Sequence, residues 1–190
     1  MNFANKISTF RILTVPFFVA SLIYYQYPQR DYLRFVALSI FILGVISDAI
    51  DGYIARKSKQ ISQAGMVLDP LGDKLLLMSA FIFLGNIKGS PYYIGFPLWV
   101  TLIVISRDII IILGAVVVYM VKQSINIFPT KWGKFTTVFQ MLSVIAVLVQ
   151  FRYVAVLWST AVFFTIISGM DYVQRGFKSL YGLDNSRNHH

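Results

Sequence analysis

The chain has 190 residues, of which 57% are hydrophobic and only 13% are charged, and its formal net charge is +9. A soluble globular domain carries about 25% charged residues, so this composition excludes a soluble enzyme, a disordered protein and a collagen-like fibre. The mean hydropathy of +0.67 predicts a polytopic membrane protein with one domain, residues 1–190. Its basic residues flank apolar runs, which favours anionic lipid headgroups or phosphorylated substrates over nucleic acid as partners.

Six apolar stretches are each long enough to cross a bilayer as a helix, which takes about 20 residues. They are residues 10–27, 34–55, 69–87, 96–121, 134–151 and 153–174. We therefore predict an all-α integral membrane fold with six transmembrane helices. The first helix is expected to stay uncleaved rather than act as a signal peptide, because bulky residues follow the small residues at 19–21.

Basic residues are distributed unequally between the two sides of this predicted bundle. With six spans, both termini lie on one side, together with most of the lysine and arginine residues. That side holds Lys6, Arg11, Arg56, Lys57, Lys59, Lys122, Lys131, Lys134, Arg175, Lys178 and Arg187. The opposite side holds Arg30, Arg34, Lys88 and Arg152. Because cytoplasmic loops carry the excess of Lys and Arg, we expect both termini to be cytoplasmic.

The inventory of reactive side chains is short. There is no cysteine, so thiol nucleophiles and iron–sulfur sites are excluded. The two histidines, His189 and His190, resemble the start of a purification tag and carry no argument. All eight acidic residues are aspartates, so any carboxylate chemistry must come from aspartate.

Four of the aspartates form two closely spaced pairs within predicted helices. Asp48 and Asp51 are three residues apart, and Asp69 and Asp73 are four apart, so each pair shares one helix face. The second helix runs toward the cytoplasm and the third returns from it, which predicts that both pairs lie just inside the cytoplasmic boundary. Pro70 is expected in the first turn of the third helix, with Asp69 in a capping position.

Burying four carboxylates in a bilayer needs compensation. Each charged residue costs about 2.5–3.5 kcal/mol at a helix centre, so four would cost about 10 kcal/mol or more at full depth. Two divalent cations would balance four carboxylates, and oxygen-only ligands favour Mg²⁺ or Mn²⁺ over zinc. Such paired metals commonly assist phosphoryl transfer. The structural alternative is that the aspartates form internal salt bridges with Lys74, Arg107 and Arg56.

The same stretch carries a dense pattern of defined residues. From Asp48 to Asp73 it reads D-x₂-D-G-x₂-A-R-x₈-G-x₃-D-x₃-D, which resembles the signature of the CDP-alcohol phosphatidyltransferase family at every defined position. Residues 5–11 resemble the start of that family's first helix. Residues 105–108 and 131–137 resemble segments of its bacterial phosphatidylglycerophosphate synthase branch, although Asp108 replaces a frequent glutamate and Thr136 a frequent lysine.

This resemblance implies an enzyme of phospholipid biosynthesis in the bacterial cytoplasmic membrane, with its active site facing the cytoplasm. It would transfer a phosphatidyl group from CDP-diacylglycerol to sn-glycerol 3-phosphate and release CMP, typically as a homodimer. Two divalent cations, Mg²⁺ or Mn²⁺, would be bound by Asp48, Asp51, Asp69 and Asp73. Asp73 would also be the catalytic base on the acceptor hydroxyl. The CDP site would be lined by Gly52, Ala55, Arg56 and Gly65.

The acceptor's phosphate would need cations close to the metal site. Four candidates are Arg107, Lys131, Lys134 and Arg175, of which Lys131 and Lys134 could equally be anchors on the cytoplasmic side of the membrane. Arg107 and Asp108 are adjacent and would point about 100° apart on a helix, so they are not expected to pair, and each needs a partner on another helix or a ligand. For Arg107 we prefer phosphate binding to a structural bridge, because the guanidinium fork suits phosphate. Asp171 is expected to be structural or to pair with Arg175 at i+4.

Two other interpretations stay open. The same chemistry could use another acceptor: phosphatidylglycerol, as in a cardiolipin synthase, serine or an inositol phosphate, although the cationic segments favour a phosphorylated acceptor over serine. A more distant alternative is a cation transporter that uses membrane aspartates. Transporters of that kind often show broken helices or paired half-repeats near the midplane, which this sequence lacks.

Overall fold

The computed structural model describes the backbone of residues 3–25, 29–58, 63–86, 95–122 and 131–187. Side chains are described over 13–25, 29–47, 74–85, 95–114 and 132–176, and at residue 120. All regular structure in these segments is helical. The helices are α1 (Phe3–Ile23), α2 (Tyr32–Ser58), α3 (Gln63–Asn86), α4 (Leu98–Lys122), α5 (Lys131–Val149) and α6 (Val154–Arg187).

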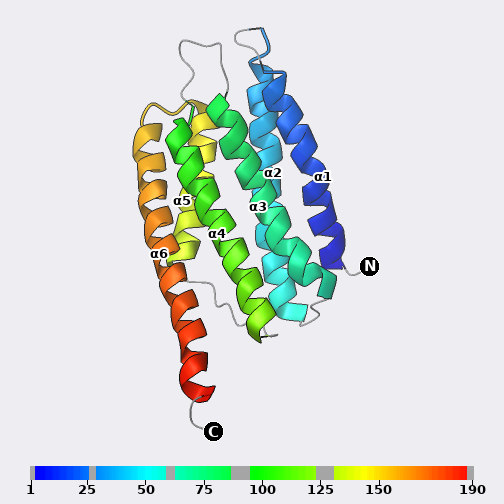
Figure 1. The fold of residues 1–190 in the computed structure, drawn as a ribbon. Helices are drawn as coiled ribbons and strands as arrows, with labels where there is room; N and C mark the ends of the chain where they lie inside the picture. The colour runs from blue at the N-terminus through cyan, green and yellow to red at the C-terminus, as the bar shows by residue number, and fades with distance from the viewer. Residues whose placement is uncertain (1–2, 26–28, 59–62, 87–94, 123–130, 188–190) are drawn as a thin grey trace.

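Successive helices alternate in direction to form one bundle (Figure 1). The start of α1 and the end of α6 lie toward the same end of this bundle, together with the end of α2 and the start of α3. Helix α1 packs on α2 and α3, α5 packs on α2, α3 and α6, α4 packs on α3 and α6, and α2 contacts α3. This arrangement follows from short connections between helices that must each bury one face.

The six helices confirm the number and order of the predicted helical stretches, but several ends differ. The third begins at Gln63 rather than at residue 69, so Asp69 and Pro70 both lie within α3. The predictions that Asp69 caps this helix and that Pro70 occupies its first turn are therefore wrong. The sixth continues to Arg187, well beyond residue 174, and its final turns project past the rest of the bundle (Figure 1). The predicted ends coincide with the ends of the apolar stretches, whereas backbone hydrogen bonding lets a helix continue into polar sequence.

The packed interior is apolar and aromatic. Phe18 of α1 lies 5.9 Å from Phe41 of α2 between ring centroids, and the ring of Phe81 on α3 stacks on that of Phe96 at 4.4 Å. Between α5 and α6 the contact is more polar. Buried Thr136 donates a hydrogen bond to the Phe164 carbonyl at 2.9 Å. Small polar side chains of this kind join helices within membranes.

The outer surface of the bundle is also apolar. Large hydrophobic side chains remain exposed on every helix, for example Phe17, Leu98 and Val156 at 69%, 69% and 64%. Among the described residues, two helical segments are long and apolar enough to cross a membrane, Trp132–Val149 and Val154–Gly176. Shorter apolar helical stretches occur at Leu13–Ile23, Tyr32–Ser47 and Lys74–Gly85. Such a surface is typical of a protein in contact with lipid rather than water.

Candidate active site

The helix bounds place the two aspartate pairs at matching heights. Asp48 lies ten residues before the end of α2, and Asp73 lies ten residues after the start of α3. At about 1.5 Å per residue, both are about 15 Å along their helices from these neighbouring ends. Asp51 and Asp69 lie closer, at about 10 Å and 9 Å. The backbone therefore brings the two pairs to one level of the bundle, as the sequence predicted.

A close contact between α2 and α3 lies beside this level. Gly44, one turn before Asp48, is buried against Leu76, which follows Asp73 by three residues. A Cβ atom added at Gly44 would lie 2.5 Å from the Leu76 side chain. The absence of a side chain at residue 44 therefore lets α3 approach α2 near the aspartates.

The side chains of the predicted metal and CDP residues are outside the part of the chain whose side chains the structure describes. These are Asp48, Asp51, Asp69, Asp73, Gly52, Ala55, Arg56 and Gly65. Their positions on α2 and α3 are defined by the backbone alone. The metal and nucleotide roles assigned to them accordingly stay predictions.

An ion cluster occupies the interior next to this segment. Lys74, the residue after Asp73, donates to the Asp108 carboxylate with Nζ 2.8 Å from Oδ1. Arg107 donates through Nη1 to the same oxygen at 2.8 Å. Its Nη2 donates to the hydroxyl of Ser168 at 2.6 Å. The cluster thus joins α3, α4 and α6 through four polar side chains.

The expectation that Arg107 and Asp108 would not pair is wrong. Their Cα–Cβ directions do diverge by about 100° on the helix, but the guanidinium lies at the end of a long flexible side chain and folds back onto its neighbour. The second half of the expectation is confirmed, because each residue also has a partner on another helix. Ser168 was missed by sequence reasoning, and its one signal was a hydroxyl within an apolar stretch of α6.

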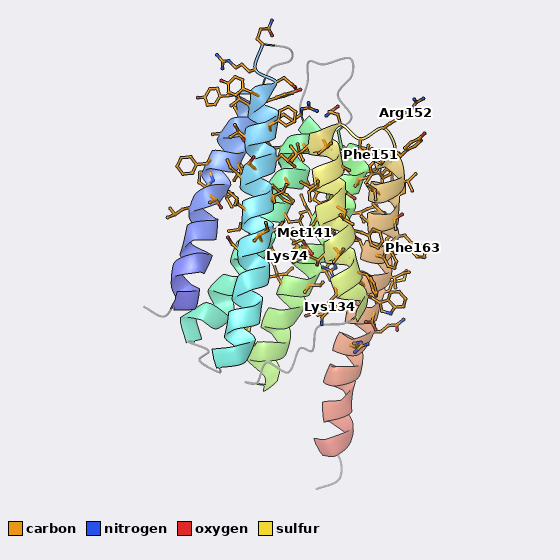
Figure 2. The ribbon with its side chains drawn as sticks, turned by 180° about the vertical axis from the view of Figure 1, so that it is seen from behind. Lys74, Lys134, Met141, Phe151, Arg152 and Phe163 are labelled. Atoms are coloured by element: carbon orange, nitrogen blue, oxygen red, sulfur yellow. The ribbon has the colours of Figure 1, made fainter. Side chains whose placement is uncertain are left out.

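The other acceptor candidates lie in more open positions. Lys134 on α5 is exposed and lies nearer the lower end of the bundle than Lys74 (Figure 2). Arg175 is exposed, and its Nε donates to Asp171 at 2.9 Å, which confirms the predicted i+4 pair. The side chain of Lys131 is not among those described. Arg107 is therefore the one described candidate that is buried, at 8% exposure.

A groove of about 640 Å³ opens between α4 and α6 beside Arg107. Its walls are mainly apolar and include Leu102, Ile110, Ile166 and Met170. Arg107 thus borders both the internal ion cluster and an apolar groove.

The sequence model of one protein family, CDP-alcohol phosphatidyltransferase, matches residues 1–167 of the chain. The chain belongs to the CDP-alcohol phosphatidyltransferase family. This confirms the resemblance seen in the spacing of the aspartates, and the match extends over all of α1 to α5 and part of α6. Membership of a phosphatidyltransferase family makes the protein a transferase.

Curated members of the CDP-alcohol phosphatidyltransferase family resemble the chain over nearly its whole length. A probable phosphatidylglycerophosphate synthase of Mycobacterium tuberculosis is 30% identical over 96% of this chain and 85% of its own. A CDP-diacylglycerol–glycerol-3-phosphate 3-phosphatidyltransferase of Haemophilus influenzae is 31% identical over 97% of both chains. The Bacillus subtilis protein of the same name is 28% identical over 94% of this chain and 97% of its own.

Proposed function

We propose that the protein transfers the phosphatidyl group of CDP-diacylglycerol to sn-glycerol 3-phosphate, giving phosphatidylglycerophosphate and CMP. The observation that carries this proposal is the end-to-end likeness to relatives named for that reaction, at 28–31% identity. The matched heights of the aspartate pairs on α2 and α3 also support it, because four carboxylates at one level could bind cations for the donor's diphosphate.

We further propose that the six helices all cross the bacterial cytoplasmic membrane and that both termini face the cytoplasm. The apolar outer surface supports six spans, and the excess of basic residues on the terminal side supports the orientation. The donor's fatty chains would stay in the bilayer while its headgroup reaches the aspartates. A homodimer is proposed on the family resemblance.

Two divalent cations, Mg²⁺ or Mn²⁺, fit the residues present. The chain offers four aspartates at one level of two adjacent helices, with no cysteine and no histidine before residue 189. Oxygen-only ligands of this kind suit these hard cations. Asp48, Asp51, Asp69 and Asp73 would bind them. When bound, the cations would offset the negative charge of the donor's diphosphate and of the departing CMP.

Transfer itself needs one general base. As the hydroxyl oxygen of sn-glycerol 3-phosphate bonds to the phosphatidyl phosphorus, that phosphorus loses its bond to CMP, which leaves with the electron pair. Asp73 would accept the hydroxyl proton, for which it must lie about 2.6–3.2 Å from the hydroxyl oxygen. Gly52, Ala55 and Gly65 would let the nucleotide approach the backbone, and Arg56 would bind its phosphate.

The acceptor's phosphate would be bound by the cationic side chains near α4, α5 and α6. Arg107 is the strongest candidate because it is buried and held at both Nη atoms. Arg175 lies on α6, which packs on α4, whereas Lys131 and Lys134 lie on α5, which packs on α6; all three could attract or contact the same anion.

Release of CMP tests the proposed reaction. Purified protein in detergent or nanodiscs is incubated with CDP-diacylglycerol and one alcohol at a time: sn-glycerol 3-phosphate, phosphatidylglycerol, inositol phosphate or serine. We expect CMP release with sn-glycerol 3-phosphate to exceed that with each other alcohol, and to exceed that with serine by at least about a hundredfold, because a site built for a phosphate rejects an acceptor that leaves its cations unpaired. Preference for another alcohol would reassign the acceptor, and cation flux in vesicles without CMP release would favour a transporter.

Replacing Arg107 by alanine tests its part in acceptor binding. We expect the KM for the acceptor to rise about tenfold or more while the KM for CDP-diacylglycerol stays within about twofold, since a charge-assisted bond to phosphate would be lost. Steady-state CMP release measures both constants. Asp108 keeps Lys74 as a partner in this variant, so its carboxylate is not left unpaired.

The matched control is Arg34→Ala, which also removes an ion-paired arginine, here from a contact with Asp31 at 3.1 Å in the first turn of α2. It should leave both KM values unchanged. An unchanged acceptor KM in Arg107→Ala would make Arg107 a structural residue.

A further inference from the structure

Asp108 is the centre of the ion cluster, and none of the proposed roles uses it. Its side chain is fully buried, and a single oxygen accepts hydrogen bonds from both Lys74 and Arg107 at 2.8 Å. We propose that Asp108 is a positioning residue, which fixes Arg107 for the acceptor's phosphate and fixes α3 at the residue next to the proposed base. This inference rests on the proposed function and identifies a residue on which binding of the acceptor and its reaction would depend.

The charges of the cluster support a positioning role. Two cations meet one carboxylate in the interior, and no other described carboxylate contacts them. A buried ion pair contributes little net stability compared with apolar packing, whereas removal of one partner leaves a costly unpaired charge. Removing Asp108 would therefore leave two neighbouring cations that repel each other, and both side chains would move apart.

The first consequence concerns α3. Lys74 follows Asp73 directly, so the contact between Lys74 and Asp108 restrains α3 relative to α4 next to the proposed base. A general base acts only within hydrogen-bond reach of its proton. A displacement of about 1 Å can reduce a rate by about a hundredfold, so loss of this contact should affect kcat.

The second consequence concerns Arg107. Asp108 and Ser168 engage one N–H on each of its two Nη atoms, and a guanidinium has five N–H donors in all. Its Nε is buried and has no partner among the described residues. The contacts with Asp108 and Ser168 thus orient the guanidinium while leaving donors for an anion. Loss of Asp108 should raise the acceptor KM.

Kinetics of Asp108→Asn in the full-length protein test the proposal. With CDP-diacylglycerol and sn-glycerol 3-phosphate, we expect kcat to fall about tenfold and the acceptor KM to rise about tenfold, with the lipid KM within about twofold. Asp108→Glu keeps the charge and should return the acceptor KM to within about threefold of wild type. The matched control Asp31→Asn breaks the ion pair with Arg34 and should change none of these constants.

A double variant separates positioning from stability. Lys74→Met combined with Asp108→Asn removes one cation with the carboxylate, so the midpoint of thermal unfolding should recover toward wild type. Because the contact between α3 and α4 is still lost, kcat should stay about tenfold low. Recovery of kcat in step with thermal stability would overturn the proposal, as would wild-type constants in Asp108→Asn.

The same assay distinguishes this inference from the proposed function. A wild-type protein that releases no CMP with any alcohol contradicts both the proposed function and the role of Asp108. A wild-type protein that transfers to sn-glycerol 3-phosphate, beside an unaffected Asp108→Asn variant, contradicts the role of Asp108 alone.

Discussion

Asp73→Asn is expected to lower kcat for transfer by about 10²–10⁴-fold, the range that a general base contributes. The amide has nearly the same shape as the carboxylate but does not take the hydroxyl proton at neutral pH. Binding of CDP-diacylglycerol should persist, because the other three aspartates and the CDP-site residues are intact. Turnover is measured as CMP release, and lipid binding as the shift in thermal unfolding that CDP-diacylglycerol produces.

The control for this variant is again Asp31→Asn, the same change at an aspartate far from α3's first half. It should retain wild-type turnover. If Asp73→Asn retained turnover as well, Asp73 would be excluded as the base. Loss of both turnover and lipid binding would instead indicate that Asp73 acts only as a ligand of the cations.

Removal of divalent cations has the second large expected effect. EDTA should eliminate CMP release, and added Mg²⁺ or Mn²⁺ should restore it, because four clustered carboxylates would otherwise repel the donor's diphosphate. Thermal unfolding gives a readout that does not depend on turnover. At a free metal concentration of about 100 times Kd, binding to the folded state alone adds about 2.7 kcal/mol of stability.

Variants of the aspartates sharpen this experiment. Asp48→Asn and Asp69→Asn remove one proposed ligand from each helix and should weaken the metal-dependent stabilisation, whereas Asp31→Asn should preserve it. A protein whose turnover and stability are both insensitive to EDTA would contradict the two-cation site.

Local patterns account for much of what could be predicted from the sequence. Apolar stretches of about 20 residues identified six helices in the right order, because length and hydropathy reflect what each segment buries. Their ends were less accurate. Neither the start of α3 at Gln63 nor the end of α6 at Arg187 coincides with a change from polar to apolar sequence.

Spacing rules within one helix were reliable for residues three or four positions apart. The pairs Asp48–Asp51 and Asp69–Asp73 share faces because of the helical repeat alone, and the i+4 contact of Asp171 with Arg175 follows from the same rule. The rule failed for Arg107 and Asp108, since divergent Cβ directions do not limit where a long guanidinium side chain ends.

The amino-acid sequence by itself determined that this chain is helical and apolar, that its carboxylates are all aspartates, and that two pairs of them recur at helical spacing with the family's pattern. Only the tertiary structure decided that Asp108 lies between Lys74 and Arg107 and that Ser168 completes the cluster. Those contacts join residues 34 and 61 positions apart. Their formation depends on how α3, α4 and α6 pack together, and no repeat within a single helix encodes that packing.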